Sequence, residues 1–194
     1  QVLEGTPEEA YVHIPKILYH WRCHRNSTAS NPASKTYAYE AGRRALEDFG
    51  REHGWKAQAE DTRHLGFYRL EFMPDALSQR SDLGAVAGPL PSRNGRLVSG
   101  IYDEAPDSTV TMRYDGLKRR FSGYMHRAVL TQDVEAADIR TMQVRPEFRK
   151  DLDLALQEIR AGADPVRTSI AFCLALRKRG FRILWDPDRK EGIH

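Results

Sequence analysis

The segment from Pro146 to Trp185 constrains the possible fold more than any other part of the chain. After Pro146, apolar residues recur at helical spacing and form one stripe: Phe148, Leu152, Leu156 and Ile159. Asp164-Pro165 is a helix start signal, and the helix that follows carries a second apolar set: Val166, Ile170, Cys173 and Leu174. Gly180 predicts the end of this helix, and the alternation of Phe181, Ile183 and Trp185 predicts a strand. Two helices followed by a strand indicate a mixed α/β protein.

Other segments fit the same class. Asn31-Pro32 predicts the start of a helix that ends near Gly54 and presents an apolar face made of Ala38, Ala41, Ala45 and Phe49. Alternating or small apolar residues predict strands at 55–59, 68–72, 83–88, 97–102 and 109–114. Asn94-Gly95 is typical of a tight hairpin turn. Residues 73–81 are polar and irregular, and we expect a junction there.

A cluster of cationic and hydroxyl side chains follows the predicted strand Ile17-Leu18-Tyr19. Its members are His20, Arg22, His24, Arg25, Ser27 and Thr28. Guanidinium groups offer a planar set of donors that suits phosphate, so the cluster predicts a small anion site. The alternative is a strand end whose charges are solvated or pair with a local acid such as Glu40.

Composition excludes several classes of protein. Forty per cent of the 194 residues are hydrophobic and 29% are charged, which is typical of a globular chain with a core. The net charge of +3 permits an anionic ligand without requiring nucleic acid. Cys23 and Cys173 have no metal-binding spacing and predict reduced thiols. The sequence predicts no transmembrane segment and no signal peptide.

Several segments, taken in order, resemble bacterial family 2 glycosyltransferases of the multidomain envelope-polysaccharide type. The opening Ile14-Pro-Lys-Ile-Leu-Tyr-His-Trp-Arg22 resembles the end of a GT-A domain, and Lys35 to Leu46 resembles the helical linker that follows it. Later segments fall in the family's order: Gly84-Ala-Val-Ala-Gly88, Asn94-Gly-Arg-Leu97, Asp133-Val-Glu-Ala136, Met142-Gln-Val-Arg145 and Phe172 to Trp185. The resemblance implies an incomplete GT-A-like mixed sheet with flanking helices. It divides the chain into a domain tail with linker (1–72), a junction (73–82) and the later half of a second domain (83–194).

The family transfers a sugar from a nucleotide-diphosphate sugar to a glycan acceptor, with Mn²⁺ or Mg²⁺ on the diphosphate. By resemblance, His20, Arg22, His24 and Ser27 lie on the diphosphate side, and His194 matches a histidine of the metal site. The resemblance also implies a cytoplasmic location, with the inner membrane surface as a second option. We expect the chain to be part of a larger multidomain protein.

Departures from the family pattern make the expected activity uncertain. About ten residues stand where the family carries its nucleotide-binding half with the Asp-x-Asp metal motif. Ser169 and Ala171 occupy positions of carboxylates, and Arg140 stands where the family has a small residue beside the acceptor. We therefore expect a glycosyltransferase-derived chain that is inactive alone and has no catalytic residue of its own. The alternative is a non-catalytic binding or interaction module that reuses the scaffold.

Two other Asp-x-Asp sequences have simpler interpretations than a metal site. Asp151-Leu-Asp153 lies within a predicted helix, where residues two apart point to different faces. Asp186-Pro-Asp188 follows a predicted strand, so it is either a metal-holding loop or a turn that ends the strand.

Overall fold

The structure is a computed structural model that describes residues 6–7, 10–12, 14–20, 36–118 and 121–189. The chain divides into two units, Gln1–Thr36 and Tyr37–His194. In the first unit, residues 14–20 form neither helix nor strand. Ile17 is 83% exposed and Tyr19 is 75% exposed, so the prediction of a buried strand at Ile17–Tyr19 is wrong. A short apolar run forms a strand only where a neighbouring strand pairs with it, and the described part of this unit supplies none.

The second unit contains helices and strands in mixed order. Its helices are α1 (Thr36–Glu52, starting at the boundary), α2 (Ala76–Gln79), α3 (Arg149–Arg160) and α4 (Pro165–Lys178). Short 3₁₀ segments are η3 (Tyr124–Val129), η4 (Ile139–Thr141) and η5 (Pro146–Phe148). The first strands are β1 (Ala57–Asp61), β2 (Tyr68–Phe72), β3 (Leu83–Ala87), β4 (Leu90–Arg93), β5 (Arg96–Val98) and β6 (Ile101–Glu104). The remaining strands are β7 (Val110–Met112), β8 (Gln132–Val134), β9 (Ala136–Ala137), β10 (Gln143–Val144) and β11 (Arg182–Trp185).

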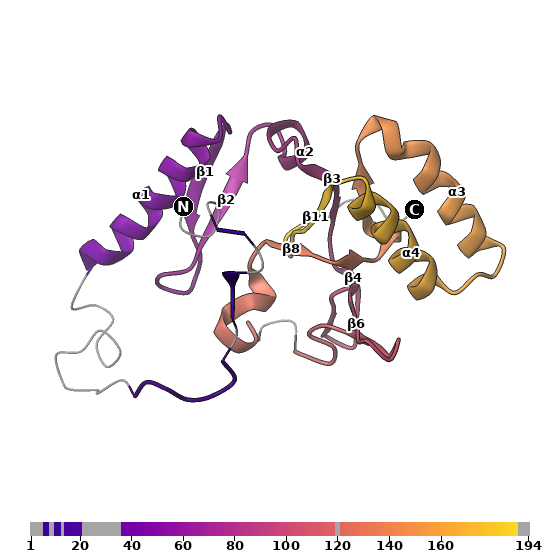
Figure 1. Cartoon of the computed structure of the whole chain (residues 1–194), viewed down its shortest axis with the longest axis horizontal. Coiled ribbons are helices and arrows are strands. Elements are labelled where there is room, and N and C mark those ends of the chain that lie inside the picture. Colours follow the sequence, from indigo (N-terminus) through magenta and orange to yellow (C-terminus); the bar gives the residue numbers. More distant parts are fainter. Residues whose placement is uncertain (1–5, 8–9, 13, 21–35, 119–120, 190–194) are drawn as a thin grey trace. The chain divides into compact units, whose positions relative to one another are not determined.

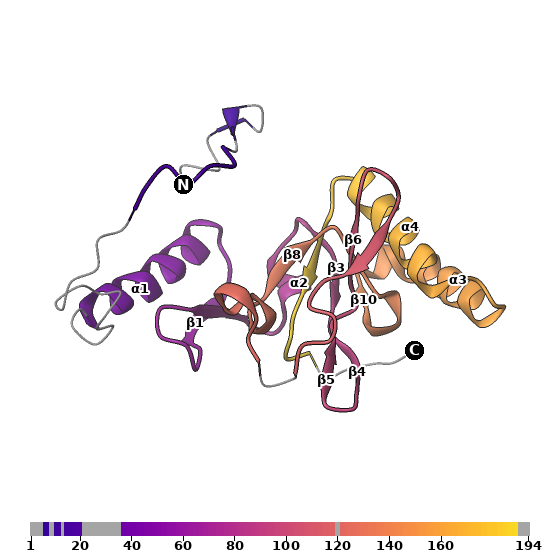
Figure 2. The ribbon, with the colours of Figure 1, turned by 90° about the horizontal axis from the view of Figure 1, so that it is seen from below.

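A four-stranded sheet with the order β10-β3-β11-β8 forms the centre of this unit. β3 and β11 run parallel, whereas β10 and β8 pair antiparallel with their neighbours. Helices α3 and α4 lie side by side, and α4 packs against β11 of the sheet (Figures 1 and 2). Apolar residues of β3 and β11 pack on both faces, because Ala85 and Trp185 join the larger core while Val86 and Leu184 pack against Leu77 of α2. The chain is thus a mixed α/β protein, as predicted.

Gly84 allows the central pair of strands to fit. The register between β3 and β11 shifts at this point, since Leu83 pairs with Arg182 and Ala85 pairs with Ile183. A Cβ atom at Gly84 would lie 2.9 Å from the Cβ of Phe181, which is closer than ordinary packing allows. A small residue is therefore required where the strand bulges.

Smaller antiparallel sheets surround the central one. β1 pairs with β2, β4 pairs with β5, and β6 lies between β7 and β9. The β4–β5 turn confirms the hairpin predicted from Asn94-Gly95, because these residues have φ angles of 51° and 70°. Such left-handed angles at both turn positions suit Asn and Gly.

Helix α1 forms as predicted from its C-terminal signal, but it packs through a different face. Gly54 has a φ of +70°, and Trp55 N–H donates to the carbonyl of Gly50 at 2.8 Å, which closes the helix. Ala38, Ala41 and Ala45 are exposed, so their predicted place in the apolar face is wrong, whereas Phe49 is half-buried as predicted. Tyr39, Gly42 and Leu46 are half-buried in place of the alanines. The tyrosine and leucine side chains cover more apolar area than alanines, and their side of the helix faces the β1–β2 hairpin, where the Tyr68 hydroxyl donates to the Tyr39 carbonyl at 2.6 Å.

Helices α3 and α4 confirm most of the predicted apolar stripes. Phe148, Leu152 and Leu156 are buried, and the Asp164 carboxylate accepts the Val166 N–H at 3.0 Å as a helix cap. Leu174 is 44% exposed, so its predicted place in the stripe is wrong. Leu176 is buried in its place, because the inner face of α4 continues through Phe172, Cys173 and Leu176.

Candidate functional site

The predicted anion and metal residues fall mostly outside the described residues. His20 is described and is exposed in the irregular segment 14–20. Arg22, His24, Ser27 and His194 lie outside the described residues. The anion site and the metal role of His194 therefore stay predictions.

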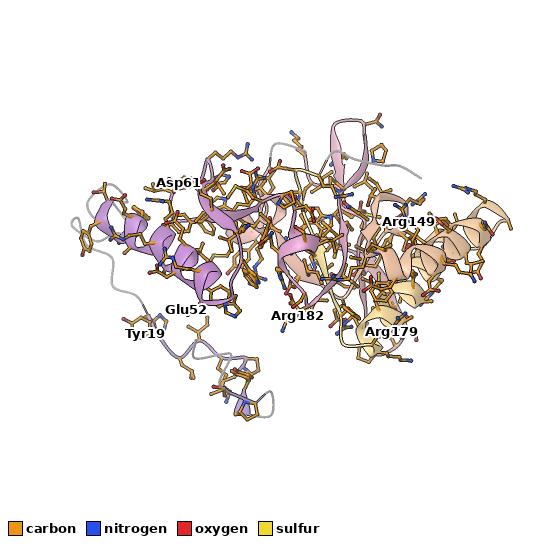
Figure 3. The ribbon with its side chains drawn as sticks, turned by 90° about the horizontal axis from the view of Figure 1, so that it is seen from above. Tyr19, Glu52, Asp61, Arg149, Arg179 and Arg182 are labelled. Atoms are coloured by element: carbon orange, nitrogen blue, oxygen red, sulfur yellow. The ribbon has the colours of Figure 1, made fainter. Side chains whose placement is uncertain are left out.

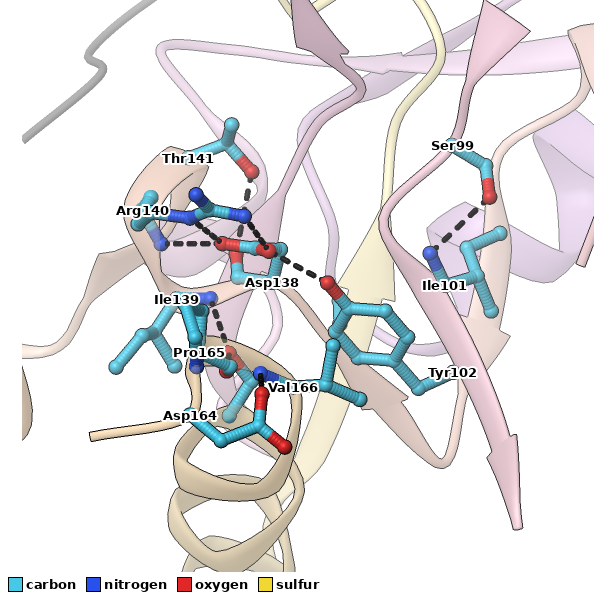
Figure 4. A network of polar contacts seen from close by, with 12 residues as sticks. Ser99, Ile101, Tyr102, Asp138, Ile139, Arg140, Thr141, Asp164, Pro165 and Val166 are labelled. Carbon is cyan, nitrogen blue, oxygen red and sulfur yellow. Dashed lines mark hydrogen bonds and ion pairs between the residues drawn. The ribbon is translucent and has the colours of Figure 1, made fainter. Parts of the chain in front are cut away.

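A buried polar network lies where β6, η4 and the start of α4 meet (Figure 4). At its centre is Asp138, whose side chain is fully buried. The Tyr102 hydroxyl donates to one carboxylate oxygen at 2.6 Å. Arg140 donates to both oxygens, from Nε at 2.9 Å and from Nη2 at 2.7 Å, and its backbone N–H donates at 3.0 Å. Asp138 thus caps η4 and forms a bidentate ion pair at once.

The surroundings of Asp138 change the ionisation of its partners. Burial and the hydrogen bond to Asp138 raise the pKa of the Tyr102 phenol above its ordinary value. The hydrogen bonds to Asp138 raise the pKa of Arg140 above its already high ordinary value, so the guanidinium stays charged. A carboxylate that accepts this many hydrogen bonds has little capacity left for a metal or for a substrate proton. We infer that the network fixes the chain between β9 and β10.

Two hydroxyl groups extend this network to neighbouring elements. The Ser169 hydroxyl on α4 donates to the Pro165 carbonyl at 2.6 Å and accepts the Ile139 N–H at 3.2 Å. The Thr141 hydroxyl donates to the Gly88 carbonyl at 2.8 Å, just after β3. Both side chains are buried and join η4 to α4 and to the end of β3.

Cys173 lies one turn further along α4 and is a buried thiol. Its sulfur lies 3.5 Å from both the backbone nitrogen and the backbone oxygen of Ala137. Burial raises the pKa of the Cys173 thiol to about 12, so the thiolate is scarce at neutral pH. A reactive cysteine needs the opposite shift, so Cys173 is a packing residue here.

A second ion network lies at the other end of the sheet, around Arg80. This arginine follows α2, is 9% exposed, and pairs with Asp82 at 2.7 Å and with Asp133 of β8 at 3.1 Å. The Trp55 ring lies 5.4 Å from its guanidinium carbon. Arg182 at the start of β11, labelled in Figure 3, donates to Asp133 at 3.1 Å. The hydrogen bonds from Arg80 outweigh the effect of burial and hold the pKa of Asp82 below its ordinary value.

One cavity with both apolar and charged lining residues lies beside the central sheet. It has a volume of about 290 Å³ and lies between β2, α2 and the ends of β3 and β11. Its apolar wall includes Phe72, Leu77, Val86 and Leu184, and its charged wall includes Arg69, Glu71, Asp75, Asp186, Asp188 and Arg189. Arg69 forms an ion pair with Asp188. A cavity lined by both apolar and charged groups is typical of sites that bind polar molecules with one apolar face.

Neither of the two Asp-x-Asp sequences belongs to a group of metal-binding side chains among the described residues. Asp151 and Asp153 are exposed on α3, and Asp151 lies 3.5 Å from Arg179, which is labelled in Figure 3. The Asp186 carboxylate accepts the backbone N–H of Asp188 at 3.0 Å, which is the geometry of a turn. Among the described residues, no group of three or more His, Cys, Asp or Glu could hold a metal ion.

Asp138, Tyr102 and Arg80 were not predicted as members of a site. A signal for Asp138 exists, because Asp follows Ala136-Ala137 and precedes Ile139-Arg140, as a cap residue would. Nothing in the sequence pairs Tyr102 or Arg80 with partners so distant along the chain.

Across the described residues, no helix is both long and apolar enough to span a membrane.

Comparison with known proteins gives one short match. A segment of 46 residues, 24% of this chain, is 46% identical to the uncharacterized protein y4gI of Sinorhizobium fredii. That match covers 5% of the length of y4gI. No family model matches the chain, and no solved structure matches it. The chain is thus similar, over a quarter of its length, to a small part of a much longer protein.

Proposed function

We propose that this chain derives from a family 2 glycosyltransferase and holds the later, acceptor-side half of a GT-A-like domain without transferring sugar by itself. The observation that carries the proposal is the burial of Ser169 and the hydrogen bonding of its hydroxyl. At the position where the family resemblance places a carboxylate, the chain has a buried hydroxyl that is bonded to Pro165 and Ile139. A serine hydroxyl in this setting cannot accept a proton from an acceptor sugar at neutral pH.

Arg140 supports the same conclusion from the acceptor side. The resemblance places a small residue there, whereas this chain has a guanidinium bonded to both oxygens of Asp138. This ion pair holds the side chain in place, and its bulk occupies space that an acceptor sugar would need. The short match to a small part of a long protein supports an origin in a multidomain chain.

By resemblance, the partners of the parent enzyme are a nucleotide-diphosphate sugar and a glycan acceptor, with Mn²⁺ or Mg²⁺ as the family's metal, at a cytoplasmic site. The described residues do not form a cluster that fits such a metal. We therefore assign the chain no metal-dependent step. In the parent enzyme the metal would neutralise the leaving diphosphate.

Calorimetry with UDP and Mn²⁺, together with an assay for UDP released from UDP-sugars, tests this proposal. We expect no UDP release above that of a buffer control and no micromolar binding of UDP. Sugar transfer by the isolated chain would overturn the proposal. If sugar transfer is observed and persists in a Ser169→Ala variant, the Ser169 hydroxyl has no role in the reaction.

A second candidate function is a non-catalytic module that binds glycan. The 290 Å³ cavity favours it, because its lining combines apolar side chains with charged ones, and a sugar presents both C–H and hydroxyl groups. Calorimetry with acidic and neutral oligosaccharides, without nucleotide, tests this function. We expect binding that is weakened in Arg69→Ala and unchanged in Arg44→Ala, which alters an exposed residue of α1. Equal binding by both variants would exclude the cavity as the glycan site.

A further inference from the structure

Two histidines from distant parts of the chain stack on each other. His64 lies in the loop between β1 and β2, and His126 lies in η3. Their ring centroids are 3.7 Å apart and the rings are inclined by only 11°. The Phe67 ring meets His126 edge-on at 4.7 Å. These rings join the loop of residues 62–67 to the segment of residues 122–129.

The hydrogen bonds around the stack define its protonation state. Arg63 Nε donates to His64 Nε2 at 3.0 Å, so this nitrogen must carry a lone pair and the His64 ring is neutral. The Ser122 hydroxyl lies 2.7 Å from His126 Nδ1. Protonation of His64 would remove the acceptor for Arg63 and place a cation against both Arg63 and His126.

The backbone of the second segment adds a further observation. Met125 and His126 have φ angles of 52° and 55°, which lie in the left-handed region. Two successive residues of this kind are unfavourable without glycine, so the surrounding contacts must hold the segment in this form. The stack with His64 and the bond to Ser122 are such contacts.

We propose that the His64–His126 stack is an acid-released latch that holds the loop 62–67 against the segment 122–129. A cavity of about 380 Å³ lies beside the latch and is lined by residues of both segments, including Thr62, Arg63 and Val129. Release of the latch separates two walls of this cavity. The inference does not depend on the proposed function.

The direction of the pH effect follows from the surroundings of His64. Burial lowers the pKa of His64 below its ordinary value, and His126 and Arg63 lower it further. The latch is therefore fully stabilised above the ordinary histidine pKa and loses stability as the pH falls below it. The other charged groups nearby are Arg127 in η3 and, around the neighbouring cavity, Glu60, Asp61, Arg69 and Asp188.

Hydrogen exchange of backbone amides at about pH 7.5 and about pH 5 tests the latch, with protection corrected for the intrinsic exchange rate. In the wild-type chain we expect protection of both segments to fall about tenfold or more at the lower pH. Amides of β3 and α4 should keep their protection and so report that the core remains folded.

A variant and a matched control make the test specific. In His64→Phe the titrating ring is replaced by an aromatic ring that can still pack on His126, so the acid loss should disappear. His53→Phe is the control, because His53 stacks on Phe49 and Trp55 at the end of α1, away from the latch. It should behave as the wild type.

The same acid response in His64→Phe and wild type would overturn the proposal. Should His64→Phe fail to fold, the wild-type and His53→Phe profiles decide. A loss confined to the two segments supports the latch, and an equal loss across the core overturns it.

Discussion

At the scale of single residues, Asp138 shows how a buried charge can be accommodated. Its carboxylate is fully buried and accepts hydrogen bonds from Tyr102 and Arg140. Buried ion pairs of this kind add little net stability when complete, but removal of one partner leaves polar groups without compensation. Substitutions around Asp138 should therefore be costly although none of them touches a ligand.

Tyr102→Phe should destabilise the fold by about 1–3 kcal/mol, because the buried carboxylate loses one charged hydrogen bond. Tyr124→Phe is the matched control, since Tyr124 is 83% exposed and its substitution should change the free energy of unfolding by less than about 0.5 kcal/mol. Urea unfolding at neutral pH measures both. Equal stability of the two variants would mean that the Tyr102 hydroxyl contributes nothing.

Cys173 should be unreactive while the chain is folded. The chain has two cysteines, so Cys23→Ser leaves Cys173 as the single thiol. With its pKa raised from 9.0 to about 12, the thiolate fraction at pH 8 falls by about a thousandfold, and burial limits access further. The stability contributed by the neutral thiol is complete below about pH 9 and is lost as the pH rises toward 12. A chromogenic disulfide reagent should label the thiol only in denaturant, and rapid labelling of folded protein would contradict the buried position.

At the scale of elements, the sequence predicted α3, α4 and β11 well, because start signals, stop signals and apolar stripes agree there. It failed where the partner of an element decided the outcome. The face of α1 was mistaken because alanines and tyrosines both recur at helical spacing, and only the β1–β2 hairpin selects between them. The strand predicted at Ile17–Tyr19 failed for the same reason.

Leu156→Ala should lower the free energy of unfolding by roughly 2–4 kcal/mol, because Leu156 is 5% exposed within the core beside α4. Leu154→Ala on the same helix is a close control, because Leu154 is 51% exposed and its loss should cost less than about 1 kcal/mol. Thermal and chemical unfolding of the two variants decide. Similar losses in the free energy of unfolding of the two variants would mean that Leu156 is no more buried than Leu154, contrary to the structure.

At the scale of the whole molecule, Arg80 connects parts that are far apart in the chain. It links the end of α2 to β8 through Asp133 and to the end of α1 through Trp55. The polar character of residues 73–81 suggested only a junction, whereas the structure shows a short helix and a buried cation there. Such a network escapes sequence analysis because its members lie 53 residues apart, as Arg80 and Asp133 do.

Arg80→Ala should destabilise the fold by roughly 2–3 kcal/mol, a value reduced because its carboxylate partners are partly exposed to solvent. Arg179→Ala, which removes an exposed pair with Asp151, should cost less than about 1 kcal/mol. Because Arg80 keeps the pKa of Asp82 low, the wild type should also lose stability as the pH falls below the ordinary aspartate pKa. The Arg80→Ala variant should lose less stability than the wild type over the same pH range. Parallel pH profiles of the two proteins would argue against this linkage.

The pairing of β3 with β11 has a consequence for biosynthesis. β3 ends at Ala87, whereas its parallel neighbour begins at Arg182, and β11 also holds β8 in the sheet. A ribosome must therefore complete nearly all of the described chain before the central strand of the sheet is available. Until then β3 and β8 have no strand between them, so their apolar residues and open edges are exposed to aggregation. Such a chain should be sensitive to the rate of translation and to truncations that remove β11.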